Sequence, residues 1–555
     1  MDFEGLPLHI SKTAAIEYLA RSNDAIAELN EEEHFKKLQI LTNQVIAAVQ
    51  IDLSLAEELS NRVEDLVHLV GSDEAKAYGL LAWGFAHPAP EYARERLSAA
   101  KTIIRIATEH GLEALFPAAD ILLLVAHLEL GEINSIDAEV INQHHTASPR
   151  IEKNPTNPAL WFSCLRSILD GDIERADRES QAIFAASEKQ GTDALALYTA
   201  QQGMISWMRG EIHGAEDRFL TARREYPEQL LWPVSLAWLW LLQGRLSSAE
   251  SLLKTIPAPE NIPHDRYWLS TITVLAEIAR MYGSEENAKQ LREALLPFAE
   301  HLVPVGVGIA FWGTCARTLG LLEEHLGMLD EAFEHLKMAV ELAKKIGALA
   351  WLAEALIELA EFAIRHDLSE VDAYQLLAEA KAISESRGFI MLAMRSMTRP
   401  RIRVLGQFEV ISLCGKRAKW TSKKARDLLK ILVANRGVAM SREVVMDILW
   451  PGESPDALWN RFAVAVNVIR RALDPERLKD SQHFVTTQGD SLNLNLENLD
   501  IDLENFFALA NHNDDLSRVK AASIYLGAPF VEEPYADWAA AVRDQAEYLR
   551  ATLPA

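Results

Sequence analysis

Residues 209–215, Arg-Gly-Glu-Ile-His-Gly-Ala, hold the short pattern that decides the fold of most of this chain. A glycine is followed two positions later by an apolar residue, and then by a small residue that opens the next apolar run. Glycine readily takes the left-handed conformation that ends a helix, and a small side chain lets the next helix pack closely. The stretch therefore predicts a turn between two packed helices.

The same pattern recurs on both sides of this stretch. Its glycines lie 40, 39, 34, 39 and 44 residues apart, at Gly131, Gly171, Gly210, Gly244, Gly283 and Gly327. Between them, apolar residues recur at steps of three and four, as on one face of a helix. A period of this length is typical of stacked helix pairs, so we expect an α-solenoid of about nine helix hairpins over residues 1–397.

These repeats resemble tetratricopeptide repeats, in the longer and more degenerate form found in large bacterial regulators of the maltose-activator type. A stack of this kind builds an extended surface. The resemblance implies that the surface binds a protein partner or a small effector. The tryptophans of the predicted helices could line a ligand groove, but we favour a role in the core for Trp83, Trp161, Trp207, Trp238, Trp240, Trp268, Trp312 and Trp351.

Charge is distributed unevenly along the 555 residues. The whole chain has 55 Lys and Arg against 80 Asp and Glu, a net charge of −25. Residues 399–500 have 17 basic and 12 acidic residues, a net of +5. A basic segment in an acidic chain is a candidate polyanion site. The alternative is a chance excess on a solvated surface.

Residues 398–500 follow a different pattern from the repeats. Apolar residues alternate with polar ones between Ile402 and Val410, which predicts short strands. Helical periodicity and a Gln-Gly-Asp turn then predict three helices and a hairpin, at residues 421–434, 441–449, 455–473 and 483–496. This order of elements predicts a small α+β winged helix-turn-helix domain after the mostly α array.

Several fragments of this region resemble the OmpR-type DNA-binding domain of the Streptomyces antibiotic regulatory protein (SARP) family. They are Arg403-Val404-Leu405-Gly406, Lys424-Ala425-Arg426-Asp427-Leu428-Leu429, Ile448-Leu449-Trp450-Pro451 and Ile469-Arg470-Arg471-Ala472-Leu473. Residues 501–555 resemble the first part of a bacterial transcriptional activator domain, so we expect a truncated domain and a short helical tail there. The resemblance implies transcription regulation by an activator, with double-stranded DNA and RNA polymerase as partners.

The third predicted helix would enter the major groove, with one face packed and the other reading bases. A 4-3-4 spacing places Phe462, Val466, Ile469 and Leu473 in the core. Asparagine can pair with adenine edges, arginine with guanine or phosphate, and valine can touch thymine methyls. Helix starts suit phosphate contacts. The candidate DNA-binding residues are Thr421, Ser422, Lys423, Lys424, Arg442, Asn460, Arg461, Val464, Asn467, Arg470, Arg471 and Gln488.

The predicted wing differs from that of the resembled family. A Gly-Tyr-Arg-Leu-like tip is replaced by Gly489-Asp490-Ser491-Leu492, so an aspartate stands where an aromatic residue is usual and the arginine is missing. A carboxylate repels phosphate, so we expect modest affinity from one copy, with a homodimer or a partner adding the rest. The alternative is a tetratricopeptide-like scaffold whose winged helix contacts protein rather than DNA.

Other functional classes lack their motifs. The chain has no phosphate-binding G-x-x-x-x-G-K-[ST], no G-x-S-x-G and no H-E-x-x-H, so we predict no enzymatic activity and no cofactor. Three scattered cysteines, and the pair His144-His145 without further ligands at suitable spacing, predict no metal site. No apolar run approaches the length of a membrane helix, so we expect a cytoplasmic protein without membrane contact.

Overall fold

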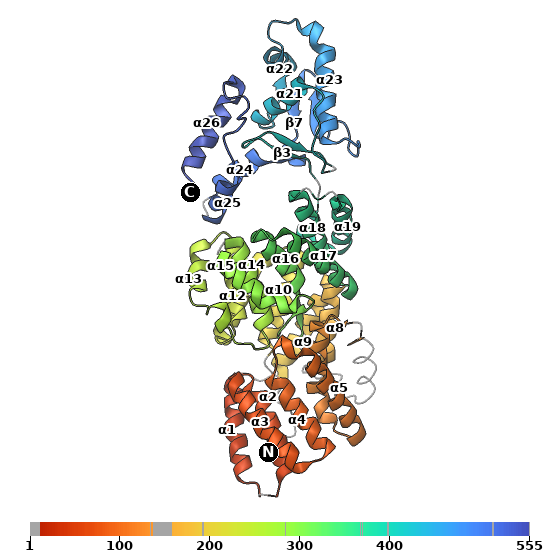
Figure 1. Cartoon of the computed structure of the whole chain (residues 1–555), viewed down its shortest axis with the longest axis vertical. Helices are drawn as coiled ribbons and strands as arrows, with labels where there is room; N and C mark the ends of the chain where they lie inside the picture. Colours follow the sequence, from red (N-terminus) through yellow and green to blue (C-terminus); the bar gives the residue numbers. More distant parts are fainter. Residues whose placement is uncertain are drawn as a thin grey trace. The chain divides into compact units, whose positions relative to one another are not determined.

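A computed structural model describes most of the chain as helices (Figure 1). The description covers residues 12–30, 32–133, 135–136, 158–190, 194–282, 285–366, 368, 370–396, 399–413, 415–512 and 515–553. Gly283, Cys414 and the pair His144-His145 lie outside it, as does the predicted domain boundary at residues 397–398. The chain divides into two compact units, one made of Met1–Trp240, Ser248–Leu359 and Glu379–Arg395, the other of Leu241–Ser247, Ala360–Ala378 and Ser396–Ala555.

The predicted mostly α fold is confirmed over the repeat region. Its α-helices are α1 Lys12–Ala27, α2 His34–Ala48, α3 Leu53–Val70, α4 Asp73–Ala86, α5 Ala93–His110, α6 Phe116–Glu129, α8 Pro158–Leu169, α9 Ile173–Gln190, α10 Leu195–Arg209, α11 Glu216–Glu225, α12 Leu231–Leu242, α13 Leu246–Leu253, α14 Trp268–Tyr282, α15 Glu285–Leu295, α16 Cys315–His325, α17 Leu329–Ile346, α18 Leu349–Arg365, α19 Ala373–Arg387 and α20 Ile390–Arg395. Successive helices such as α2 and α3, α8 and α9, or α16 and α17 pack against each other, as expected for stacked helix pairs.

The repeated turn has the predicted geometry wherever it is described. The glycines have positive φ angles of 67°, 70°, 76°, 74° and 75°, at Gly131, Gly171, Gly210, Gly244 and Gly327. The small residues that follow are fully buried, at Ala176, Ala215, Ala249 and Ala332. The glycine thus ends one helix, and the alanine lets the next element approach its neighbour.

The tryptophans of the array mostly contribute to its interior. The buried ones include Trp161, Trp238, Trp268 and Trp351. Trp83, Trp207, Trp240 and Trp312 are half-buried. The half-buried Trp240 donates its indole N–H to Glu216 Oε1 at 2.8 Å.

One part of the array is not helical, and the prediction of a helix around Trp312 is wrong. Residues Leu302–Val305 (β1) and Ala310–Thr314 (β2) form an antiparallel hairpin. Pro304 removes a backbone donor, and three glycines at positive φ angles, Gly306, Gly308 and Gly313, favour turns over helix. Apolar content alone did not separate this hairpin from a buried helix.

The C-terminal unit contains the predicted α+β arrangement. Its elements are β3 Arg401–Arg403, β4 Glu409–Ile411, α21 Lys423–Ala434, β5 Met440–Ser441, α22 Arg442–Leu449, α23 Pro455–Leu473, β6 Val485–Gln488, β7 Ser491–Leu494, β8 Asp500–Ile501, α24 Asp502–Ala510, α25 Asp515–Ile524 and α26 Asp537–Ala551. One sheet has the order β4-β3-β8 and the other β5-β7-β6. Three helices, α21 to α23, are followed by the β6–β7 hairpin, in the predicted order of elements.

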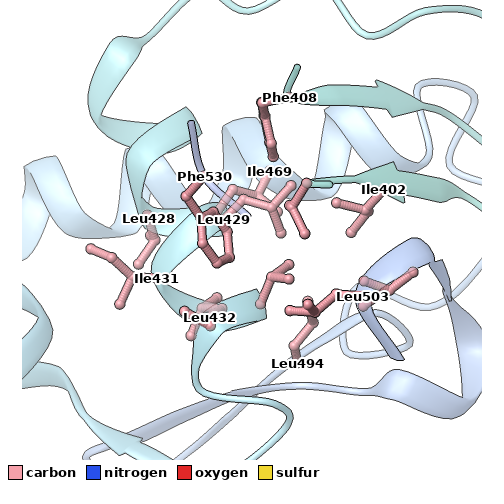
Figure 2. Packing of buried hydrophobic residues seen from close by; sticks show 14 of the residues in the cluster. Ile402, Phe408, Leu428, Leu429, Ile431, Leu432, Ile469, Leu494, Leu503 and Phe530 are labelled. Atoms are coloured by element: carbon pink, nitrogen blue, oxygen red, sulfur yellow. The ribbon is translucent and has the colours of Figure 1, made fainter. Parts of the chain in front are cut away.

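One hydrophobic core joins the sheet, the helices and the tail of this unit (Figure 2). Ile402 of β3, Leu429 of α21 and Ile469 of α23 belong to it. So do Leu503 of α24 and Phe530, which follows α25. Residues beyond position 500 therefore share one core with the strands and helices that precede them.

A buried ion pair fixes the tail to α21. Lys430 is fully buried, and its Nζ lies 2.6 Å from Glu532 Oε2 and 2.6 Å from Glu533 Oε1. Arg426 also pairs with Glu532, at 2.6 Å. Burial raises the pKa of Glu532, but hydrogen bonds and charges from Lys430 and Arg426 outweigh it and hold the pKa below its usual range. This stabilisation is present at neutral pH and is lost as the pH falls through the lowered pKa.

We predict that the double substitution Glu532→Gln and Glu533→Gln destabilises the C-terminal unit by about 2–4 kcal/mol, because it leaves the Lys430 ammonium buried without a carboxylate. Lys430→Met removes the buried charge itself and keeps an apolar stem, so it should cost less. Urea titration read by hydrogen exchange of α21 peptides measures both. A larger loss for Lys430→Met would contradict the assignment.

Candidate nucleic-acid interface

Helix α23 is held by one apolar stripe. Phe462, Val466, Ile469 and Leu473 are all buried, as the 4-3-4 spacing predicts. Pro455 stands at the start of the helix, where its missing N–H costs nothing. The helix packs against both α21 and α22, so its rotation about its own axis is fixed.

The opposite side of α23 faces solvent. Asn460, Arg461, Val464, Asn467 and Arg471 are all exposed. Val464 is 60% exposed, which is high for a valine and shows that nothing in the described chain covers it. Five of the six candidates on this helix thus share one accessible face.

Arg461 is already engaged by a carboxylate. Its Nη1 lies 2.7 Å from Glu453 Oε2, and both side chains are about half exposed. The guanidinium carbon lies 4.9 Å from the centre of the Trp450 ring. These contacts orient the side chain, but the carboxylate offsets its charge.

Trp459 is an exposed aromatic residue that the sequence analysis did not single out. It is 41% exposed, and the guanidinium of Arg442 lies 5.4 Å from its ring centre. Trp459 lies three residues before Phe462 and so continues the three- and four-residue spacing of the buried stripe, which would predict a core position. The sequence pattern therefore gave no signal of its exposure. Arg442 is therefore held between the start of α22 and the first turns of α23.

Arg470 is directed toward the wing instead of outward. Its Nη2 donates to the carbonyl oxygen of Val485 in β6 at 2.9 Å, and the side chain is half-buried. Burial lowers the pKa of the Arg470 guanidinium from its usual value. The expected phosphate contact would require this side chain to leave the β6 carbonyl.

At the start of α21, one side chain caps the helix and one lysine is hydrogen-bonded to a neighbouring helix. Ser422 Oγ accepts the N–H of Ala425 at 3.2 Å, the geometry of an N-cap. Lys424 Nζ donates to the carbonyl of Leu449 at 2.6 Å, where its charge suits the C-terminal end of α22. Thr421 and Lys423 are exposed.

The wing is a tight hairpin without a cation at its tip. Gln488 pairs with Ser491, and Gly489 has a φ angle of 57°. Gln488 and Asp490 are exposed. The N–H of Arg442 donates to the carbonyl of Asp490 at 2.8 Å, so the wing is attached to the start of α22.

Much of the basic excess of residues 399–500 is offset within the unit. Three of its basic residues pair with carboxylates that lie beyond residue 500 and are not counted in the net of +5: Arg426 and Lys430 with Glu532, Lys430 also with Glu533, and Arg436 with Glu504. A polyanion would therefore meet a smaller positive charge than the composition predicts.

The described residues contain no group of three or more His, Cys, Asp or Glu side chains placed to hold a metal ion. Within the same residues no helix has the length and hydropathy needed to span a bilayer. Cys164 and Cys315 are buried, which raises the pKa of both thiols.

Comparison with known proteins does not assign the chain to a family. No family model matches the chain, and no curated protein matches it. A similar solved structure is described as the crystal structure of the APC/C hetero-tetramer Cut9-Hcn1, with a TM-score of 0.39 and 15% identity. The alignment covers 68% of this chain and 66% of that one, slightly less than two thirds of its length.

We predict unequal effects on stability for substitutions of two adjacent arginines. Arg470→Ala should destabilise the unit by about 1–2 kcal/mol, because it removes a half-buried hydrogen bond to β6. Arg471→Ala should leave stability within about 0.5 kcal/mol, because its side chain is exposed. Thermal unfolding of both variants, with hydrogen exchange of the β6–β7 hairpin, tests this. Equal effects would contradict the assigned role of Arg470.

Proposed function

We propose that this chain is a SARP-like transcriptional regulator whose winged helix binds duplex DNA and whose helical array binds a protein or a small-molecule signal. The observation that carries the proposal is the exposed polar face of α23, which is opposite a fully buried stripe. A helix held in this way can enter a major groove without losing its core contacts. We propose no catalytic activity for the chain.

The exposed side chains have the chemistry of base recognition. Asn460 and Asn467 can each donate to and accept from an adenine edge, and Arg471 can donate to guanine or phosphate. Val464 offers an apolar contact to a thymine methyl group. Lys423, exposed at the start of α21, suits a phosphate contact that positions the unit.

The charge of one copy supports only modest affinity. Arg461 is paired with Glu453, Lys424 is bonded to Leu449, and the wing tip has Asp490 in place of a cation. We therefore propose that a homodimer or a second protein contributes to binding. RNA polymerase is the partner that the resemblance to activators implies.

The second candidate is a protein-interaction scaffold. The repeat array and the net charge of −25 support it. So does the winged helix, where Val444, Ile448 and Trp459 are exposed apolar side chains on α22 and α23. Aromatic and aliphatic side chains of this kind are common at protein interfaces. In this case α22 and α23 would contact protein, and duplex DNA would not bind.

We predict that Asn467→Ala weakens binding to a selected duplex by about 1–3 kcal/mol, through the loss of a bidentate base contact. Lys423→Ala should weaken binding to all sequences and reduce the salt slope by about one unit. Fluorescence anisotropy at several salt concentrations measures both effects. Asn505→Ala, at an exposed position on α24, is the matched control and should change neither value.

A gain of affinity is also predicted. Glu453→Gln should strengthen DNA binding, because it releases Arg461 and removes a carboxylate near the phosphates. Glu64→Gln makes the same change of net charge on an exposed side chain of α3 and serves as the control. If both variants bind like the wild type, Arg461 has no part in the interface. If neither the wild type nor any variant binds DNA at low salt, the proposed regulator function is wrong and the protein-interaction scaffold is the better proposal.

A further inference from the structure

The β1–β2 hairpin is an extended segment inside a helical array. All residues from Leu302 to Phe311 are buried, including the tip between the two strands. A surface hairpin would expose one face and its turn. This hairpin therefore lies in the interior of the array and not on its surface.

The helices around the hairpin come from distant parts of the array. β1 packs against α6 and α14, and β2 packs against α8, α10 and α17. In a solenoid of stacked repeats, each helix pair normally contacts only its neighbours. The hairpin therefore adds contacts that bypass several intervening pairs.

A hydrogen bond and an aromatic contact join the hairpin to these helices. Gln201 of α10 is buried and donates its Nε2 to the carbonyl of Ile309 at 3.2 Å. The ring centre of Phe311 lies 4.7 Å from that of Trp351 in α18. Trp351 in turn lies 5.3 Å from Trp207 of α10.

The tip glycines allow this close approach. Gly308 has a φ angle of 74°, and a Cβ added there would lie 2.9 Å from Leu128 Cδ1 of α6. A Cβ added at Gly306 would lie 2.9 Å from the Tyr267 ring. The backbone of the hairpin tip thus lies directly against Leu128 of α6 and against Tyr267, the residue just before α14.

We propose that the β1–β2 hairpin is an internal brace that joins α6, α8, α10 and α18 into one cooperatively unfolding body. Without it, stability would be a sum of terms between neighbouring pairs, and each pair could open by itself. With it, opening at the hairpin exposes surfaces on helices up to about 220 residues apart in the chain, from α6 to α18. The array then responds to a bound partner as one body instead of bending pair by pair.

Two glycine variants test the brace in the full chain. Gly308→Ala adds a methyl group against Leu128 and strains a left-handed backbone. Gly327→Ala imposes the same strain at a φ angle of 75°, but no atom lies within 4 Å of its added Cβ. Hydrogen exchange read by mass spectrometry should show α6, α8 and α10 exchanging on the order of tenfold faster together in Gly308→Ala. Gly327→Ala should affect only the α16–α17 turn.

Two adjacent glutamines provide a milder test that does not depend on a steric clash. Gln201→Leu removes the bond to the hairpin carbonyl, whereas Gln202→Leu removes a bond from α10 to Asp177 of the neighbouring α9. We expect Gln201→Leu to speed exchange in α6 and α18 as well as α10, and Gln202→Leu to act on α9 and α10 alone. The brace is refuted if Gln201→Leu speeds hydrogen exchange in α10 and its sequence neighbours alone. If Gly308→Ala does not fold, the two glutamine variants provide the test.

Discussion

The burial of Phe462, Val466, Ile469 and Leu473 fixes how α23 is turned about its axis, and the proposed interface depends on that orientation. Each buried side chain of this size stabilises the packed state by about 1.5–3 kcal/mol. Rotating the helix by one residue step would expose part of this stripe and turn Asn467, or in the other direction Arg461, toward the apolar core. The outward face is therefore set by apolar packing on the inner side, and the chemistry available to a partner follows from it.

Many charged side chains of the C-terminal unit form ion pairs within that unit. Lys430 of α21 is buried between Glu532 and Glu533, and Arg436, just after α21, pairs with Glu504. Cations of α21 and of the turn after it therefore bind the tail that follows β8. Those cations are unavailable to a polyanion. Recognition of DNA by this unit would consequently rely on a few directional contacts from α23 more than on a broad positive surface.

Sequence patterns correctly predicted the structural features that residues close together in the chain determine. The glycine turns, the helix bounds around α21 to α23 and the outward face of α23 follow from periodicity and capping, which nearby residues determine. The β1–β2 hairpin was missed because its apolar run is equally compatible with a buried helix, and its partners lie up to about 190 residues away. The bonds of Lys424 to Leu449 and of Arg470 to Val485 were missed because they join elements that meet only after folding.

The central claim is that the exposed face of α23 reads a base sequence. Selection of duplexes from a random library by the full chain tests it most directly, because such a library offers the protein every short base sequence at once. The account predicts that successive rounds enrich one motif, and that a chain with Asn467→Ala loses the preference at one position of it. The claim would be contradicted if folded protein at low salt recovered duplexes whose sequences do not differ from those of the input library.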